Sequence, residues 1–173
     1  MPSILICGMT TWSPRKSIPD SNSLLKNYLC GHPERSEGPA RRTNMEKEWE
    51  QAIRRGDVDL VRRLVEQGAV IDSKDRHGQT ALMIASMRGH TDVVRLLVEN
   101  RAELNHTAKC HLSALMLAVI NGHAEIVRIL AEARADAEIR GTGAPGFYGM
   151  TALQLAEGMK RDEIVAILKN RPA

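Results

Sequence analysis

Aromatic side chains are scarce in this chain of 173 residues, where Phe, Trp and Tyr together make up 3%. Apolar residues nevertheless reach 43%, so any core must be built from Leu, Ile, Val, Ala and Met. Thin layers of helices suit such an aliphatic core better than a sandwich of sheets or a large enzyme cavity. Long hydrophobic runs are also lacking, and none reaches the roughly 18 residues that a membrane-spanning helix requires.

Cysteine is equally rare. Cys7, Cys30 and Cys110 are odd in number and widely spaced, and no Cys-x-x-Cys occurs. This usage argues against a disulfide framework and against a zinc site built on thiolates. The apolar stretch 4–7 is too short for a signal peptide, and basic residues follow it rather than precede it. We therefore expect a cytoplasmic protein.

A strong charge of one sign is missing from most of the chain. The formal net charge is +3, with 24 basic and 21 acidic residues. Residues 1–44 hold six of the basic and three of the acidic residues, so 18 of each sign remain in 45–173. A neutral domain exerts little electrostatic pull on nucleic acid.

Residues 1–44 differ from the rest of the chain. They contain five of the seven prolines and no sustained period of either 2 or 3.6 residues, which predicts a disordered leader without a function of its own. The segment 32–39, HPERSEGP, resembles the translation of repetitive DNA between the genes of some bacteria. Because a clean helical pattern begins at Met45, we hypothesise that translation starts there. Peptides from 17–35 in native protein would overturn this hypothesis.

The stretch 78–100 predicts two short helices, over 81–88 and 91–99. Gly89 can adopt the left-handed conformation that ends a helix, and Thr80 and Thr91 are suited to cap the two helix starts. Neither helix is long enough to be stable alone, so the pair must stack on neighbours.

A repeat of 33 residues supplies those neighbours. The turn glycines and the second-helix segments recur at this spacing, the latter at 59–66, 92–99 and 125–132. A fourth copy, over 151–170, follows 38 residues after the third. Repetition over four copies is more specific than any single motif. We expect units at about 45–75, 76–108, 109–146 and 147–173, with turn glycines at Gly56, Gly89 and Gly122.

This unit resembles the ankyrin repeat. The resemblance rests on the D-x-x-G-x-T-A-L of 75–82, on the Gly-His pairs at 89–90 and 122–123, and on the apolar core of each second helix. It covers 45–173 and implies an all-α, ankyrin-type solenoid of about four helix-turn-helix repeats with short extended turns. It also implies a non-catalytic protein–protein interaction module.

The chain departs from the family pattern in two ways. Thr-Pro-Leu-His becomes Thr-Ala-Leu-Met at 80–83, which removes a helix-starting proline and a histidine that bonds neighbouring turns. Arg101 and Arg134 stand where the first repeat has Gly68. If this site is left-handed, each arginine costs on the order of 1 kcal/mol. We expect a less stable domain than an idealised array.

The terminal copies carry the polar substitutions that keep a stack soluble at its ends. Arg63 replaces the apolar Leu96 and Ile129, and Lys160 replaces the turn glycine. Trp49 aligns with the leucines of later repeats and is interpreted as a core residue.

No pattern for catalysis or for a cofactor is found. The glycine-rich 141–146 lacks the Lys-Ser/Thr and the preceding strand of a nucleotide-binding loop. His106, Cys110 and His111 fit no established zinc spacing. His90 and His123 follow turn glycines and are interpreted as structural. No nucleophile–base arrangement appears. We expect neither enzyme activity nor a bound metal or cofactor.

Partners of ankyrin-like stacks usually contact the turn tips and the exposed face of the first helices. Projecting those positions by the period predicts a surface that runs from basic to apolar along the stack. Its residues are Arg54, Arg55, Arg76, His77, Gln79, Met87, Arg88, Lys109, Cys110, Leu112, Ile120, Asn121, Phe147, Tyr148, Met150 and Met159.

The enlarged connection 138–149 leaves two interpretations of Phe147 and Tyr148. They are either anchors for a partner or plugs over the junction between the third and fourth repeats. For the whole domain we expect a monomer that binds a protein of unknown identity, without a small-molecule substrate or a membrane. One alternative is a regulatory or inhibitory subunit of an enzyme, and a weaker one is a nucleic-acid-associated adaptor.

Overall fold

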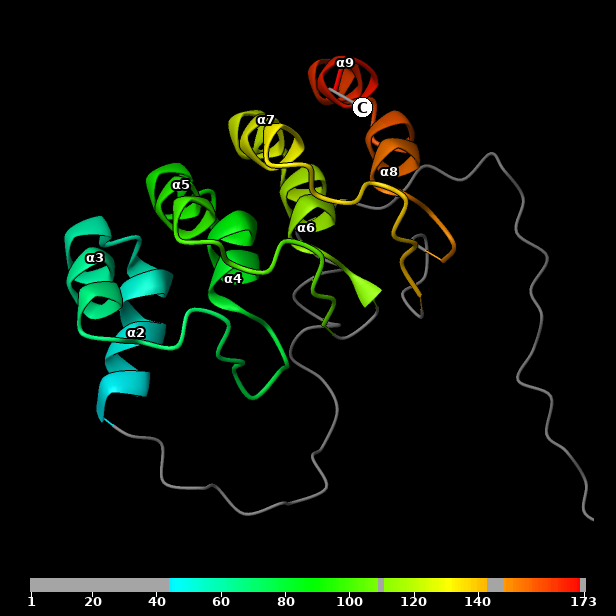
Figure 1. The fold of residues 1–173 in the computed structure, drawn as a ribbon. Helices are drawn as coiled ribbons and strands as arrows, with labels where there is room; N and C mark the ends of the chain where they lie inside the picture. Colours follow the sequence, from blue (N-terminus) through cyan, green and yellow to red (C-terminus); the bar gives the residue numbers. More distant parts are fainter. Residues whose placement is uncertain (1–43, 109–110, 143–147, 172–173) are drawn as a thin grey trace, which may run out of the picture.

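The structure is a computed structural model that describes residues 44–108, 111–142 and 148–171. These residues form helices, turns and a single isolated bridge between Thr107 and Ser113. The helices, shown in Figure 1, are α2 (Asn44–Arg55), α3 (Val58–Glu66), α4 (Ala81–Arg88), α5 (Thr91–Glu99), α6 (Ala114–Asn121), α7 (Ala124–Glu132), α8 (Ala152–Gly158) and α9 (Asp162–Lys169).

The helices are stacked in two layers (Figure 1). The first helices of the repeats, α2, α4, α6 and α8, form one layer, and the second helices, α3, α5, α7 and α9, form the other. Each helix packs on its partner within the repeat and on its counterpart in the next repeat. Turns project from the layer of first helices, on the side away from the second helices. The prediction of an all-α stack of about four repeats is confirmed.

The central repeat has the two helices that its sequence predicts. α4 and α5 begin and end at the expected residues, and Gly89 ends α4 with a φ of 82°. The capping prediction is wrong in detail. Thr80 lies at the N-cap of α4 but its side chain makes no capping hydrogen bond, and Thr91 is the first residue of α5, whose N-cap is His90.

The core is aliphatic, as the composition indicates, and runs through all four repeats. Leu82, Leu97 and Leu130 are at most 1% exposed. Trp49 is 5% exposed and closes the core at the first repeat, which confirms its interpretation as a core residue. Burial of such side chains is the main favourable term in folding, at about 25 cal/mol for each Å² of apolar surface.

The turn glycines are required by the repeat that follows. A Cβ atom on Gly56 would lie 2.5 Å from the His90 ring, and one on Gly89 would lie 2.7 Å from the His123 ring. His90 also places its Nε2 atom 3.3 Å from the carbonyl oxygen of Arg54, as expected for a structural histidine. Lys160 takes the equivalent left-handed place in the fourth repeat, where no further repeat among the described residues packs over it.

Neighbouring turns are hydrogen bonded despite the missing motif histidine. Asp72 Oδ1 accepts from the Glu103 N–H at 2.9 Å, and Asn105 Oδ1 accepts from the Asp136 N–H at 2.8 Å. His106 Nε2 lies 3.1 Å from the Gly78 carbonyl oxygen. These bonds join each turn to the next one and take over the linking role of that histidine.

The two arginines that replace glycine are left-handed, with φ values of 60° at Arg101 and 62° at Arg134. We expect Arg101→Gly and Arg134→Gly each to raise the free energy of unfolding by about 0.5–1 kcal/mol, because glycine adopts this conformation without strain. Denaturant titration of the variants measures the change. As a control, Arg62→Gly in the exposed face of helix α3 is expected to lower stability by about 1 kcal/mol. Equal losses at all three positions would refute the interpretation.

Candidate protein-interaction surface

The turn before α4 is organised by a nearly buried carboxylate. Asp75 has a side chain only 3% exposed, and its Oδ1 accepts hydrogen bonds from the backbone N–H groups of His77 at 2.7 Å and Gln79 at 2.9 Å. Gly78 supplies the positive φ of 75° that the turn requires. A side-chain carboxylate that bonds the N–H two residues on fixes the local backbone conformation. The turn tip is therefore presented in one conformation.

Arg54 connects this turn to α2. Its Nη2 atom lies 2.7 Å from Glu50 Oε1 and 3.5 Å from Asp75 Oδ2. The guanidinium thus joins a carboxylate on its own helix to the carboxylate inside the turn. Arg54, which the periodicity assigns to a partner, is engaged in an intramolecular ion pair in this structure.

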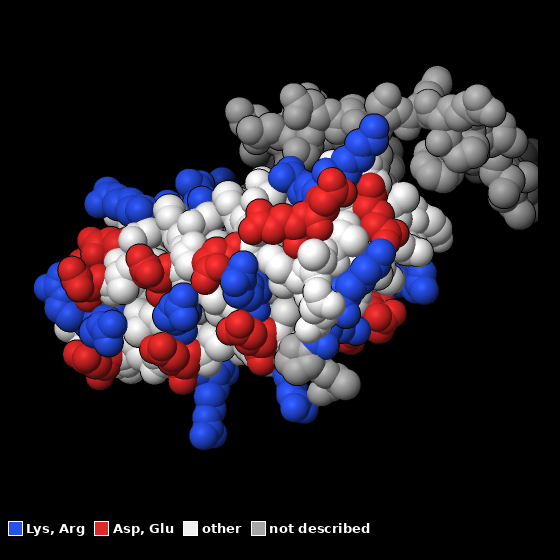
Figure 2. Space-filling view, turned by 90° about the horizontal axis from the view of Figure 1, so that it is seen from above, with Lys and Arg blue, Asp and Glu red and all other residues white. Residues whose placement is uncertain are grey.

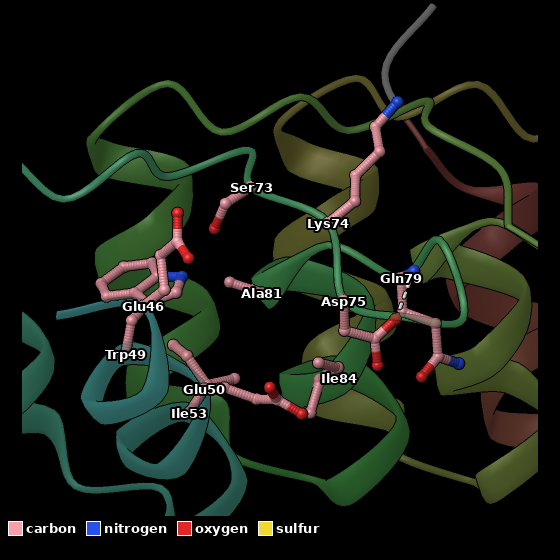
Figure 3. A pocket seen from close by; sticks show the side chains of 10 residues that line it. All are labelled: Glu46, Trp49, Glu50, Ile53, Ser73, Lys74, Asp75, Gln79, Ala81 and Ile84. Carbon is pink, nitrogen blue, oxygen red and sulfur yellow. Dashed lines mark hydrogen bonds between the residues drawn. The ribbon is translucent and has the colours of Figure 1, made fainter. Parts of the chain in front are cut away.

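A cavity of about 120 Å³ lies between α2, the turn and α4 (Figure 3). The Trp49 indole forms one side of it, and the Nε1 atom of that ring is buried without a hydrogen-bond partner among the described residues. The other lining residues are Glu46, Glu50, Ile53, Ser73, Lys74, Asp75, Gln79, Ala81 and Ile84.

Four of the residues predicted to contact a partner are exposed. They are Arg55, Arg76, Arg88 and Tyr148, and Tyr148 retains 78% of its surface. The half-buried ones are Arg54, His77, Met87, Asn121, Met150 and Met159.

Three other predicted contacts are corrected by the structure. Gln79 is 6% exposed, Leu112 4% and Ile120 0%, so none of them offers its surface to a partner in this conformation. Leu112, just before α6, and Ile120 pack into the hydrophobic core, and α6 itself is buried from Ala114 to Ile120. Gln79 is one of the residues that line the cavity beside α2, although its side-chain amide extends away from the other lining side chains (Figure 3). The predicted contacts Lys109, Cys110 and Phe147 lie outside the described residues.

The enlarged connection before the fourth repeat is closed at its base. Gly141 N–H donates to the Met150 carbonyl oxygen at 3.0 Å, and Gly149 N–H donates to the Gly141 carbonyl oxygen at 2.7 Å. Arg140 Nη1 adds a 2.8 Å bond to the Gly149 carbonyl oxygen. Since Tyr148 is 78% exposed just inside this base, it does not plug the junction between the third and fourth repeats.

The outer face carries charge of both signs (Figure 2). Glu125 Oε1 lies 3.7 Å from Arg95 Nη2 in the preceding repeat, and its Oε2 lies 3.5 Å from Arg128 Nε. All three side chains are about half exposed, and such pairs contribute little to stability. Alternating charges of this kind do not form the continuous basic surface that nucleic-acid binding requires.

Metal and membrane sites are not found in the described part of the chain. Within residues 44–108, 111–142 and 148–171, no three His, Cys, Asp or Glu side chains come together around a point that could hold a metal ion. His111 instead places Nδ1 3.1 Å from Thr142 Oγ1. None of the described helices is long and apolar enough to cross a membrane.

Sequence reasoning missed the cavity and the role of Asp75. The spacing of the Asp75–Gly78 motif contains the signal for the turn, because Asp bonds backbone N–H groups two to four residues on. No comparable signal marks the cavity, since it depends on the distance between α2 and α4.

The family model for ankyrin repeats in three copies matches residues 49–108 and 102–173. The chain therefore belongs to the ankyrin repeat family, whose domains generally serve as protein–protein interaction modules. No catalytic domain accompanies the repeats in this match. A search of curated proteins finds no match to the chain.

Proposed function

We propose that this ankyrin domain is a non-catalytic module that binds one protein partner through its turn tips and the adjacent ends of its first helices. The single observation that supports this is the fixed turn around Asp75. Its backbone is held by two hydrogen bonds from N–H groups, and Arg54 ties it to α2. A preorganised turn loses little conformational freedom on binding, which favours affinity.

The chemistry of the exposed tips indicates the partner's surface. Arg55, Arg76 and Arg88 are exposed in the first two repeats, and the Arg76 Nε atom donates to His77 Nε2 at 3.0 Å. Arginine is among the residues that most often dominate binding energy at interfaces. An acidic patch on the partner would complement this end of the stack, while Tyr148 offers an aromatic contact at the other end.

We expect the double variant Arg76→Ala/Arg88→Ala to bind the partner at least about tenfold more weakly, because it removes both arginines from the proposed contact surface. Proteins captured from cells of the source organism by the wild-type chain identify candidates by mass spectrometry. Dissociation constants measured with the purified candidate then give the size of the effect.

Arg62→Ala is the matched control, since Arg62 is an exposed arginine on the outer helix α3. It should leave the dissociation constant unchanged. The proposal fails if Arg62→Ala weakens binding as much as the double variant, or if the double variant folds normally and binds like the wild type.

A further inference from the structure

A groove of about 430 Å³ lies between α7 and α9, in the layer of second helices (Figure 1). Two alanines contribute to its lining, Ala131 on α7 and Ala166 on α9. Ala131 stands where the preceding repeat has Val98, and Ala166 stands where the second and third repeats have Arg95 and Arg128. Two small residues thus leave room where the earlier repeats carry larger side chains.

The third repeat shows which side chain lies beside a carboxylate at this place. Glu125, in the first turn of α7, contacts two arginines. Arg95 Nη2 of the preceding repeat lies 3.7 Å from its Oε1, and Arg128 Nε lies 3.5 Å from its Oε2. Glu163 is the counterpart of Glu125 on α9 and lines the groove. The residue three positions after it is Ala166 rather than an arginine, and Glu163 forms no ion pair within the described part of the chain.

The groove therefore holds negative charge that lacks a partner. Glu132 also lines it and, like Glu163, is exposed and forms no ion pair among the described residues. Both arginines of the lining contact carboxylates outside it, and for Arg171 the distance from Nη2 to Glu138 Oε1 is 3.4 Å. A cation that enters the groove meets two carboxylates that no described residue neutralises.

The groove is open to solvent rather than enclosed. Its volume reaches the ~300–1,000 Å³ of pockets for small molecules, but such pockets bury most of the ligand's surface. Ala131, 5% exposed, is the only buried residue of the lining. The site therefore suits a side chain that a protein presents together with its backbone.

The apolar part of the lining suits the stem of an arginine. Ala131, Ala166 and the half-buried Ile167 place apolar surface beside the two carboxylates. Long cationic side chains lay their methylene groups along apolar surface and keep the charged end in water. The planar guanidinium of arginine also bonds a carboxylate through two N–H groups at once, in a fixed geometry that the ammonium group of lysine does not offer.

We propose that this groove receives an arginine side chain of a protein partner. The guanidinium of that arginine pairs with Glu163 and faces Glu132, as arginines of the second and third repeats pair with the equivalent carboxylate on α7. Its stem lies on Ala131 and Ala166. This inference goes beyond the proposed function, because the turn tips project from the layer of first helices and the groove lies in the other layer (Figure 1). The domain then has two separate contact surfaces.

The blocked peptide acetyl-Ala-Arg-Ala-amide tests the site on the full chain, labelled with ¹³C in its alanine methyl groups. We expect the peptide to shift the Ala131 and Ala166 methyl signals saturably, with a dissociation constant on the order of 1–10 mM. Each signal is assigned by its loss in an alanine-to-serine variant. The same peptide with citrulline, a neutral isostere of arginine, should bind about tenfold more weakly, because it loses the attraction of both carboxylates. A lysine peptide should bind about threefold more weakly, because it lacks the planar fork.

Variants of the groove test the vacancy itself. Ala166→Arg is expected to abolish the peptide-induced shift of the Ala131 methyl signal, because the introduced side chain fills the groove and pairs with Glu163. Ala166 is exposed, so the variant should fold, which circular dichroism checks. Glu163→Gln should weaken binding of the arginine peptide about threefold. Glu66→Gln is the matched control, since Glu66 is an exposed glutamate of α3 far along the stack, and it should have no effect.

Four results would overturn the inference. They are equal binding of the citrulline and arginine peptides, tighter binding of the lysine peptide, unchanged binding by folded Ala166→Arg, and an absence of shifts at Ala131 and Ala166. None of these results depends on Arg76 or Arg88, so the proposed function is tested separately.

Discussion

Replacing Gly89 by Ala is expected to lower the free energy of unfolding by about 3 kcal/mol. Gly89 has a φ of 82°, a conformation that costs an L-residue roughly 1–2 kcal/mol. The new Cβ atom would also lie 2.7 Å from His123 Cε1 and 3.0 Å from its Nδ1, and overpacking of this kind costs about 1–3 kcal/mol. Chemical denaturation followed by circular dichroism measures the loss.

Gly68→Ala separates the two contributions. Gly68 is also left-handed, with a φ of 86°, but no atom lies within 4 Å of the position its Cβ would take. It should therefore lose only about 1–2 kcal/mol from backbone strain. Adding His123→Ala to Gly89→Ala should recover part of the larger loss, because the two residues are in contact and their effects are not additive. If Gly68→Ala and Gly89→Ala cost the same, the histidine ring does not constrain the glycine.

Truncation of Leu97 to Ala is expected to cost about 3 kcal/mol. Leu97 is 0% exposed in α5, which packs against α3 on one side and α7 on the other, so the cavity left behind has little room to collapse. Buried Leu→Ala changes typically cost about 2–5 kcal/mol, the sum of lost burial and the cavity. The midpoint and slope of a urea titration give the change.

Val70→Ala is the control for this truncation, since Val70 is an apolar residue with 70% of its surface exposed. A change within about 0.5 kcal/mol is expected there. A loss below about 1 kcal/mol for Leu97→Ala would show that the stack relaxes around the missing side chain, contrary to the tight packing of α5.

The sequence predicts most of this fold because its signals are local and repeated. Gly89 marks the end of α4, and the apolar spacing of 92–99 marks the buried face of α5. Side-chain capping is harder to predict, since it depends on rotamers. Thr80 and Ser113 occupy equivalent N-caps, yet only Ser113 accepts a bond from the backbone, of Met116.

The candidate site could be predicted only in part. Projection by the period treats every repeat alike, and it correctly places Arg76 and Arg88 at the surface. It fails for Gln79 and Leu112, which hold the same place in successive repeats and are both buried, and for Ile120. Ile120 is buried although Met87 at the equivalent place is only half-buried, so its burial depends on what surrounds α6. The burial of Trp49 follows from its alignment with core leucines, but its unmet N–H depends on the space between three elements and has no counterpart in the sequence.

The hydrogen bonds at the base of the 141–149 connection make the geometry of the stack independent of the length of that segment. Because the bonds between Gly141, Gly149 and Met150 hold the two ends together, the helices on either side keep their spacing whatever the segment between them contains. For a flexible insert placed between these two ends, each doubling of the insert's length costs only about 0.6 kcal/mol. This connection is therefore where the chain can acquire new sequence at little cost in stability, and it is the position of choice for grafting a binding peptide or a reporter.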